Sequence, residues 1–112
     1  MIKPQQGDII LTSLDPVKGH EQSGYRPALV VSNEIFNSES NLVLVCPITN
    51  TNRGKLMDIP LSGTETRGYI LCEHIRALDL KSRGYKLTCD TVSKETLYEV
   101  IDIIQGAVDV LS

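Results

Sequence analysis

Two hydrophobic periods divide this chain, and the change between them constrains its fold more than any other feature. Before residue 92, apolar residues come in short runs between turn signals, as in GDIILTSL at 7–14 and RPALVVS at 26–32. From residue 92 onward they fall on one helical stripe, made of Leu97, Val100, Ile101, Ile104 and Val108. Short strands followed by one amphipathic helix predict a mainly β (α+β) domain, a small partly open barrel with a helix against it.

Further strands are expected at 42–48, 55–61, 69–75 and 84–89. Pro27 cannot donate to a ladder, so it should lie at the start of its strand or on a sheet edge. The polar connection 33–41 has room for one helical turn around Ile35 and Phe36. Ser93 is a suitable N-cap for the last helix, with Glu95 in its first turn.

The length of 112 residues suits a single domain spanning 1–112, and the 41% apolar content supports a packed core. The longest apolar runs are too short to span a bilayer, and the first residues, MIKP, do not resemble a signal peptide. We therefore expect a cytoplasmic protein with no membrane association.

The cysteines do not form a metal-binding or disulfide pattern. Cys46, Cys72 and Cys89 are widely spaced, without a C-x-x-C pair, and each has apolar or β-branched neighbours. Only two histidines, His20 and His74, are available to a zinc site. We expect the three thiols to be buried structural residues, and we expect no metal or other cofactor.

The net charge of −3 is unevenly distributed. Residues 91–112 carry Lys94 against four acids, whereas the segment 53–86 is rich in basic residues: Arg53, Lys55, Arg67, Arg76, Lys81, Arg83 and Lys86. That segment can present a positive face to phosphate although the protein is acidic overall. The alternative is ordinary solvated surface.

The stretch VKGHEQSGYRPALVVSN at 17–33 places charged residues at the mouth of an apolar strand. Gly19 and Gly24 allow sharp bends on either side of its polar centre, and Pro27 restricts the backbone of Arg26. Glu21 and Arg26 carry opposite charges within one short loop and can orient one another. The alternative is a hairpin loop whose charges simply face water.

These residues suit metal-free ribonuclease chemistry, which needs a base, donors for the growing phosphate charge and an acid for the leaving oxygen. Arg26 can clamp two phosphate oxygens through its planar fork, and Thr49, at the end of the strand 42–48, can donate to a third. Glu21 or His20 can accept the proton. No carboxylate cluster in the sequence suits Mg²⁺.

The motifs resemble those of the MazF/PemK toxins of bacterial toxin–antitoxin systems. They are G-H-E-Q-S-G-Y-R-P-A-L-V-V-S, then P-I-T in the next strand, then L-C-E-H-I-R-A-L-D at 71–79. The resemblance runs from G-D-I-I-L through the C-terminal helix, and the order and distances of the motifs make it specific.

The resemblance implies an SH3-like barrel that forms a homodimer and acts as a metal-independent endoribonuclease. Such enzymes cut single-stranded RNA at short sequences, leave 2′,3′-cyclic phosphate and 5′-hydroxyl ends, and are blocked by a cognate antitoxin. It implies Arg26 and Thr49 as the catalytic pair, with Glu21 as the supporting acid. We expect RNA contacts from a wider set: His20, Gln22, Tyr25, Arg53, Lys55, Arg67 and Arg76.

Two histidines depart from the family pattern. His20 stands where a small residue is usual, and it can be a general base, an RNA contact or a solvated residue. His74 stands where glutamine is frequent, and we expect a packed strand residue there in preference to a functional one. The Arg26 guanidinium remains protonated and is not expected to act as the base. The general base can therefore be Glu21, His20 or water.

Two other function classes compete with the ribonuclease. One is a non-catalytic toxin of the CcdB type, which acts by binding a protein target such as DNA gyrase. The other is a regulatory barrel that binds RNA without cutting it. Arg26 and Thr49 favour the ribonuclease, because a gyrase binder has no need of them.

Overall fold

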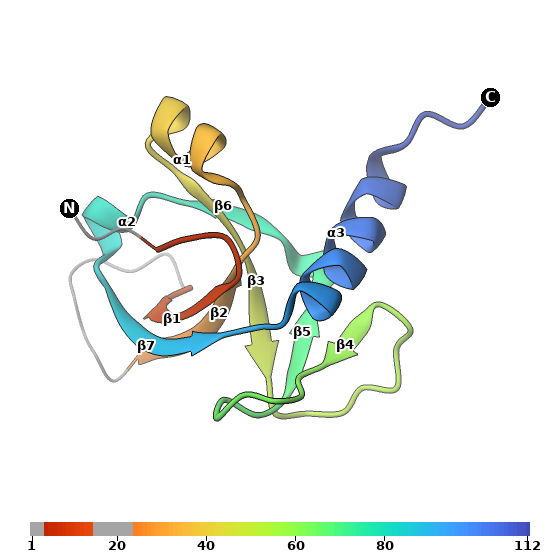
Figure 1. The fold of residues 1–112 in the computed structure, drawn as a ribbon, viewed down its shortest axis with the longest axis horizontal. Coiled ribbons are helices and arrows are strands. Elements are labelled where there is room, and N and C mark those ends of the chain that lie inside the picture. The colour runs from red at the N-terminus through yellow and green to blue at the C-terminus, as the bar shows by residue number, and fades with distance from the viewer. Residues whose placement is uncertain (1–3, 15–23) are drawn as a thin grey trace.

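The computed structural model describes residues 4–14 and 24–112, and Figure 1 shows their arrangement. Strands of one curled sheet follow the order β4-β5-β3-β2-β1-β7, and β6 also pairs with β3. Within this part of the chain, the paired neighbours are all antiparallel, and the strand order ends at β4 and β7 without closing. The expected partly open barrel with a C-terminal helix is confirmed.

The elements follow the turn signals of the sequence. The strands are β1 (Asp8–Ser13), β2 (Tyr25–Val30), β3 (Val43–Thr49), β4 (Asp58–Pro60), β5 (Tyr69–Leu71), β6 (Arg76–Leu78) and β7 (Tyr85–Thr91). The helices are α1 (Glu34–Ser40), the 3-10 turn η2 (Cys72–His74), α2 (Leu80–Arg83) and α3 (Lys94–Val108).

Strand β3 is the branch point of the sheet. It pairs with β2 along one edge, while its other edge pairs first with β6 and then, beyond Val45, with β5. The 3-10 turn η2 joins β5 to β6 and allows both strands to use the same edge of β3. Thr49 at the end of β3 therefore lies where the sheet bends from one half to the other.

Alternating side chains build two cores on opposite faces of the sheet. Ile9, Leu29 and Cys46 face α3 and pack with Val100 of that helix. Their neighbours Ile10, Val30 and Val45 point the other way and pack with Leu80 of α2. We call these the α3 face and the α2 face, because strand residues two apart share a face.

Helix α3 begins as expected, with the Ser93 side chain accepting the Thr96 N–H at 3.1 Å. Val100 is fully buried and Ile104 is half-buried, but Val108 is 75% exposed. The helix runs past the sheet, as Figure 1 shows, so the expected stripe ends one turn early. None of the described helices is long and apolar enough to cross a membrane.

Two expected strands are wrong in extent. The strand expected at 55–61 is reduced to β4, because the chain turns at Lys55, whose carbonyl accepts the Asp58 N–H, and Leu56 is exposed. The strand expected at 69–75 ends at Leu71, because the chain then turns through η2 before starting β6.

Of the other local expectations, some are confirmed and some are wrong. Pro27 lies near the start of β2, one residue before the β2–β3 ladder begins at Ala28. The helix at 33–41 is longer than one turn, since Asn33 caps it through the Phe36 N–H and Asn41 closes it at positive φ. Cys46 and Cys72 are buried as expected, but Cys89 is exposed, at a bulge between β1 and β7.

Candidate active site

Arg26 and Thr49 come from neighbouring strands. The β2–β3 ladder pairs Val30 with Val45 and Ala28 with Pro47, and Arg26 and Thr49 each lie two residues beyond its last pair. By alternation both side chains lie on the α2 face, beyond the apolar residues of that core. Arg26 is exposed, and its guanidinium makes no hydrogen bond or ion pair within the described residues.

Thr49 is held in place by its own turn and by a close backbone contact. Its hydroxyl oxygen accepts the Thr51 N–H at 3.1 Å, which leaves the hydroxyl proton available to a ligand. Gly68 lies against its carbonyl group: a Cβ at position 68 would come within 2.3 Å of the Thr49 oxygen. Thr49 is thus a half-buried hydroxyl on a constrained strand end.

From Thr49, a row of paired residues continues across the sheet to β4. Tyr69 of β5 pairs with Thr49, and Pro60 of β4 pairs with Tyr69. Directly paired residues point to the same side of an antiparallel sheet. The Thr49 hydroxyl and the Tyr69 ring are therefore neighbours over β3 and β5, and Arg26 comes from β2, the strand on the other side of β3.

The loop between β1 and β2 carries three further expected residues. His20, Glu21 and Gln22 lie outside the described residues, so their expected roles stay predictions. Both ends of this loop are described. Arg76 donates to the Leu14 carbonyl, Arg83 donates to the Ser13 carbonyl at 3.1 Å, and the Tyr25 hydroxyl donates to the Arg83 carbonyl at 3.4 Å. These contacts fix the two strand ends from which the loop departs.

Arg53 binds carboxylates of its own chain. Its Nε and Nη2 atoms donate to the two Asp58 oxygens at 2.8 and 2.7 Å, and Nη2 also reaches Glu73 at 3.0 Å. The Lys55 ammonium lies 3.8 Å from Glu73. The Asp58 side chain is only 3% exposed, and the hydrogen bond from Arg53 holds the pKa of this carboxyl below its usual value of 3.8.

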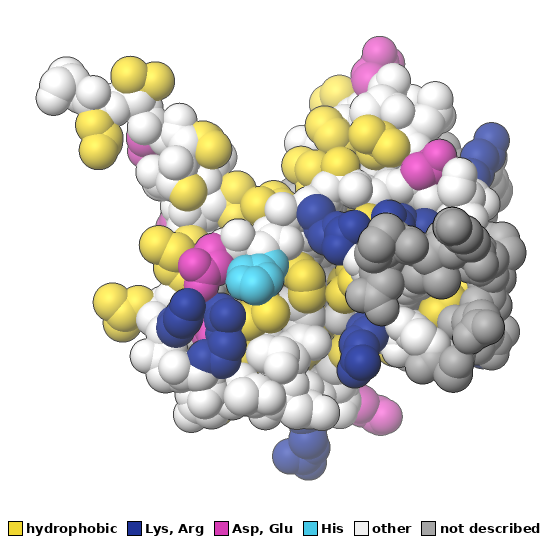
Figure 2. Space-filling model, turned by 180° about the vertical axis from the view of Figure 1, so that it is seen from behind, with side chains coloured by type: hydrophobic (Ala, Val, Ile, Leu, Met, Phe, Trp, Pro, Cys, Tyr) yellow, Lys and Arg dark blue, Asp and Glu magenta, His cyan; other side chains and the backbone are white. Residues whose placement is uncertain are grey.

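Figure 2 shows the face on which this charged cluster lies. Its cyan side chain is His74, the one described histidine, with acidic and basic side chains beside it. His74 is exposed and belongs to η2, so the expectation of a packed strand residue is wrong. Further basic side chains lie on the same face.

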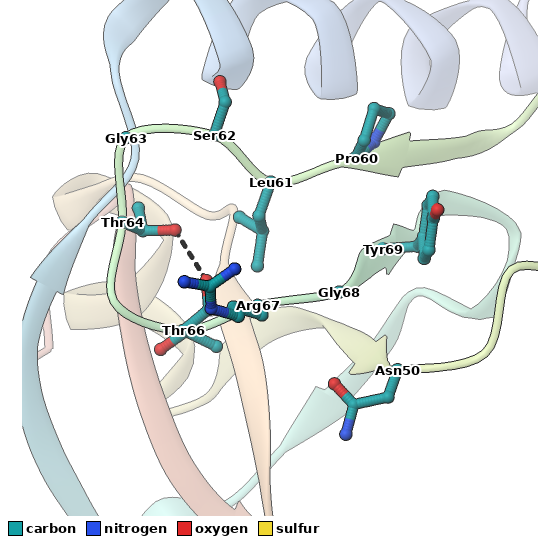
Figure 3. A pocket seen from close by; sticks show the side chains of 10 residues that line it. All are labelled: Asn50, Pro60, Leu61, Ser62, Gly63, Thr64, Thr66, Arg67, Gly68 and Tyr69. Atoms are coloured by element: carbon teal, nitrogen blue, oxygen red, sulfur yellow. Dashed lines mark hydrogen bonds between the residues drawn. The ribbon is translucent and has the colours of Figure 1, made fainter.

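A pocket of about 490 Å³ opens beside Thr49, in the loop between β4 and β5. Figure 3 shows Leu61 and Arg67 next to one another on the loop, with Tyr69 and Asn50 on the strand side. The Asp90 carboxylate anchors the loop by accepting the Thr66 N–H and hydroxyl, both at 2.7 Å. The backbone hydrogen bond from Thr66 lowers the pKa of Asp90.

The sequence reasoning missed Asn50, Asp58, Gly68 and Asp90. Asn50 carried a weak signal, since it follows Thr49 directly. The other three act through contacts with residues that are distant in the chain, and no local pattern indicates them. Among the described residues, no three His, Cys, Asp or Glu side chains gather closely enough to hold a metal ion.

Comparison with known proteins gives consistent matches. Residues 5–107 match the family model described as PemK-like, MazF-like toxin of type II toxin–antitoxin system. The chain is 36% identical over 81 residues to the endoribonuclease toxin MazF of Escherichia coli K12, which covers 72% of this chain and 73% of that protein.

Solved structures agree with the sequence match. The crystal structure of MazF from Deinococcus radiodurans superposes with a TM-score of 0.80 at 30% identity, covering 94% of this chain and 96% of that one. A MazE–MazF crystal structure from the same organism has a chain with a TM-score of 0.80 at 25% identity, covering 96% of this chain and 97% of that one.

Proposed function

This chain belongs to the PemK-like, MazF-like toxins of type II toxin–antitoxin systems, and on that premise we propose how its residues cut RNA. The protein is a toxin endoribonuclease of such a system. We propose that it cleaves single-stranded RNA, messenger RNA included, at a short sequence and without a metal ion. The placement of Arg26 and Thr49 on one face of β2 and β3 carries this proposal.

In the proposed reaction, the ribose 2′-oxygen attacks the adjacent phosphorus while its proton passes to a base. The bond from phosphorus to the 5′-oxygen breaks, and that oxygen takes up a proton. The products carry a 2′,3′-cyclic phosphate and a 5′-hydroxyl. Because the nucleophile belongs to the substrate, the enzyme's task is proton transfer and stabilisation of charge.

Arg26 and Thr49 supply the stabilisation in this scheme. The exposed guanidinium of Arg26 has no described partner and can bind two phosphate oxygens with its fork. The Thr49 hydroxyl accepts from Thr51 and can donate its proton to a third oxygen. Glu21, His20 or water acts as the base, with Glu21 the supporting acid of the loop.

The remaining expected residues bind the RNA strand around this centre. Arg67 has no described hydrogen bond or ion pair, whereas Arg53 and Arg76 each retain N–H groups that their internal contacts do not use. The proposed set of RNA-binding residues also includes Lys55, Tyr25, His20 and Gln22.

Its partner is a cognate antitoxin, in line with the MazE–MazF complex of Deinococcus radiodurans. We propose further that the active unit is a homodimer in the cytoplasm, and that the antitoxin covers the RNA groove.

The test is digestion of a long single-stranded RNA in EDTA by the purified, antitoxin-free protein. Arg26→Ala is compared with Lys94→Ala, which removes an exposed cation from the first turn of α3. We expect discrete cuts with cyclic-phosphate ends from the wild type and from Lys94→Ala, and a loss of at least about 100-fold in Arg26→Ala. No cuts from the folded wild-type protein would refute the proposal and favour a toxin that acts by binding a protein target.

A further inference from the structure

We propose that the pocket between β3 and the β4–β5 loop is a subsite for one nucleobase of the RNA, beside the bond that is cut. This inference rests on the proposed ribonuclease function and adds to it a site that helps to determine the cleaved sequence. Three side chains define the subsite: Asn50, Arg67 and Tyr69.

Its position ties the pocket to Thr49. Asn50 follows Thr49 in the chain, and Tyr69 is the cross-strand partner of Thr49. Gly68 separates Arg67 from Tyr69 and lies so close to the Thr49 carbonyl that only a hydrogen atom fits between them. The wall of the pocket is therefore in contact with the backbone of the proposed catalytic threonine, and the pocket begins at the residue that follows it.

The chemistry of the lining matches a nucleotide. Tyr69 offers a half-buried ring on which a base can stack. The Asn50 amide carries two donors and an acceptor, the combination that can pair with the edge of a base. The Arg67 guanidinium can bind a phosphate or a base edge. Within the described residues, none of these three side chains makes a hydrogen bond or an ion pair, so all three are available to a ligand.

The loop that forms the other wall is held in shape without a ligand. Asp90 of β7 accepts the Thr66 N–H, the Thr66 hydroxyl and the Glu65 N–H, the last at 3.2 Å. The Leu61 N–H donates to the Gly68 carbonyl at 2.9 Å and closes the base of the loop. A preformed pocket of about 490 Å³ spares the ordering cost of binding, and its volume lies in the range of small-molecule sites.

The experiment is a cycle between protein variants and modified RNA. The substrate is an RNA oligonucleotide with one cut site mapped for the wild type, made in a series with an abasic residue at each flanking position in turn. kcat and KM are measured for the wild type, Asn50→Ala, Arg67→Ala and the control Lys94→Ala. Thermal melting of each variant checks that it is folded.

We expect one flanking position at which the abasic residue lowers the wild-type kcat/KM by about tenfold or more. Asn50→Ala should lower kcat/KM on the intact RNA to a similar extent, and the two changes together should cost no more than either alone, because they remove the same contact. When the abasic residue is at any other position, its effect on kcat/KM and that of Asn50→Ala should be independent of one another. The effects of Lys94→Ala and of the abasic residue should be independent at every position. Tyr69→Phe keeps the ring and should have the kcat/KM of the wild type on this RNA. Tyr69→Leu removes the ring and should lower kcat/KM as Asn50→Ala does.

Independent effects at every position, from a wild-type protein that cuts RNA, would overturn the base subsite and leave the proposed function intact. No cutting by the wild-type protein would overturn the proposed function and the subsite together.

Discussion

Gly68 and Thr49 are in backbone contact across the β3–β5 pair: a Cβ on Gly68 would lie 2.3 Å from the Thr49 carbonyl oxygen. The glycine also has a φ of +129°, a conformation that other residues rarely adopt. The sequence therefore needs glycine here for two reasons, and both bear on the strand end that carries the proposed catalytic hydroxyl.

Gly68→Ala should accordingly move the end of β3. We expect the free energy of unfolding to fall by about 1–3 kcal/mol, because neither the backbone at Thr49 nor that at Gly68 can move away without breaking the β3–β5 pairing. RNA cleavage should fall with it at temperatures where the variant is folded. Gly63→Ala is the matched control, since Gly63 also has positive φ but has no atom within 4 Å of its Cβ position. Equal loss of stability in both variants, measured by urea unfolding, would contradict the role of the contact.

Acid should destabilise the fold through Asp58 and Asp90. Hydrogen bonds from Arg53 to Asp58 and from the Thr66 backbone to Asp90 hold the pKa of each carboxyl below its usual 3.8 in the folded protein. The stability that they contribute is complete above that value and is lost as pH falls through the lower folded pKa.

Urea unfolding between pH 7 and pH 2 measures this effect. The wild type should lose stability mainly below about pH 4. Asp58→Asn should be less stable at pH 7, by about 5 °C or more in Tm, and should lose less on acidification. Asp102→Asn, which changes an exposed acid of α3 with no described partner, should follow the wild-type profile. A profile for Asp58→Asn parallel to that of the wild type would exclude Asp58 as a source of the acid sensitivity.

Thr49 offers a test that separates its hydroxyl from its packing. Thr49→Ser keeps the hydroxyl and should retain most of the activity, whereas Thr49→Val keeps the shape and should lose about 100-fold in kcat. The valine also leaves the Thr51 N–H without its acceptor, which should cost about 1 kcal/mol of stability. Cleavage assays beside thermal melting distinguish the two effects, and an active Thr49→Val would remove Thr49 from the catalytic pair.

The hydrophobic pattern predicted the architecture because β1, β2 and β3 are short apolar runs buried on both faces, whereas α3 has apolar residues at helical spacing. It could not divide residues 69–78 correctly, since β5, η2 and β6 form one continuous stretch whose breaks depend on which part of β3 each strand joins. Val108 has the right spacing for burial, but the sheet ends before the helix does.

For the site, the sequence indicated which residues to consider but not which of them lie next to one another. Arg26 and Thr49 could be chosen from their motifs, yet their shared face depends on a register between strands that are far apart in the chain. Arg53 looked like a free surface cation, and its engagement by Asp58 and Glu73 follows from the turn at 50–57. Long-range contacts of this kind decide which cations remain available to RNA.

The thiols should react very differently with a disulfide reagent. Burial raises the pKa of Cys46 to about 12 and that of Cys72 to about 11, whereas Cys89 is exposed on β7. At pH 8 we expect one thiol per chain to react at once and two more only after unfolding, because the thiolate is the reactive form. Cys89→Ser should abolish the fast phase, and a fast phase that survives this change would contradict the burial of Cys46 and Cys72.

RNA affinity should depend on salt through the cations that have no internal partner. Arg26 and Arg67 make no described hydrogen bond or ion pair, so each can displace a counterion from RNA. For an RNA made uncleavable by a 2′-deoxy residue at the cut site, Arg26→Ala or Arg67→Ala should each reduce the slope of log affinity against log salt by about 0.7. Lys94→Ala should leave the slope unchanged, because α3 lies on the opposite face of the sheet from Arg26. A slope that no variant changes, measured by fluorescence anisotropy from about 50 to 200 mM salt, would show that these guanidinium groups do not contact phosphate.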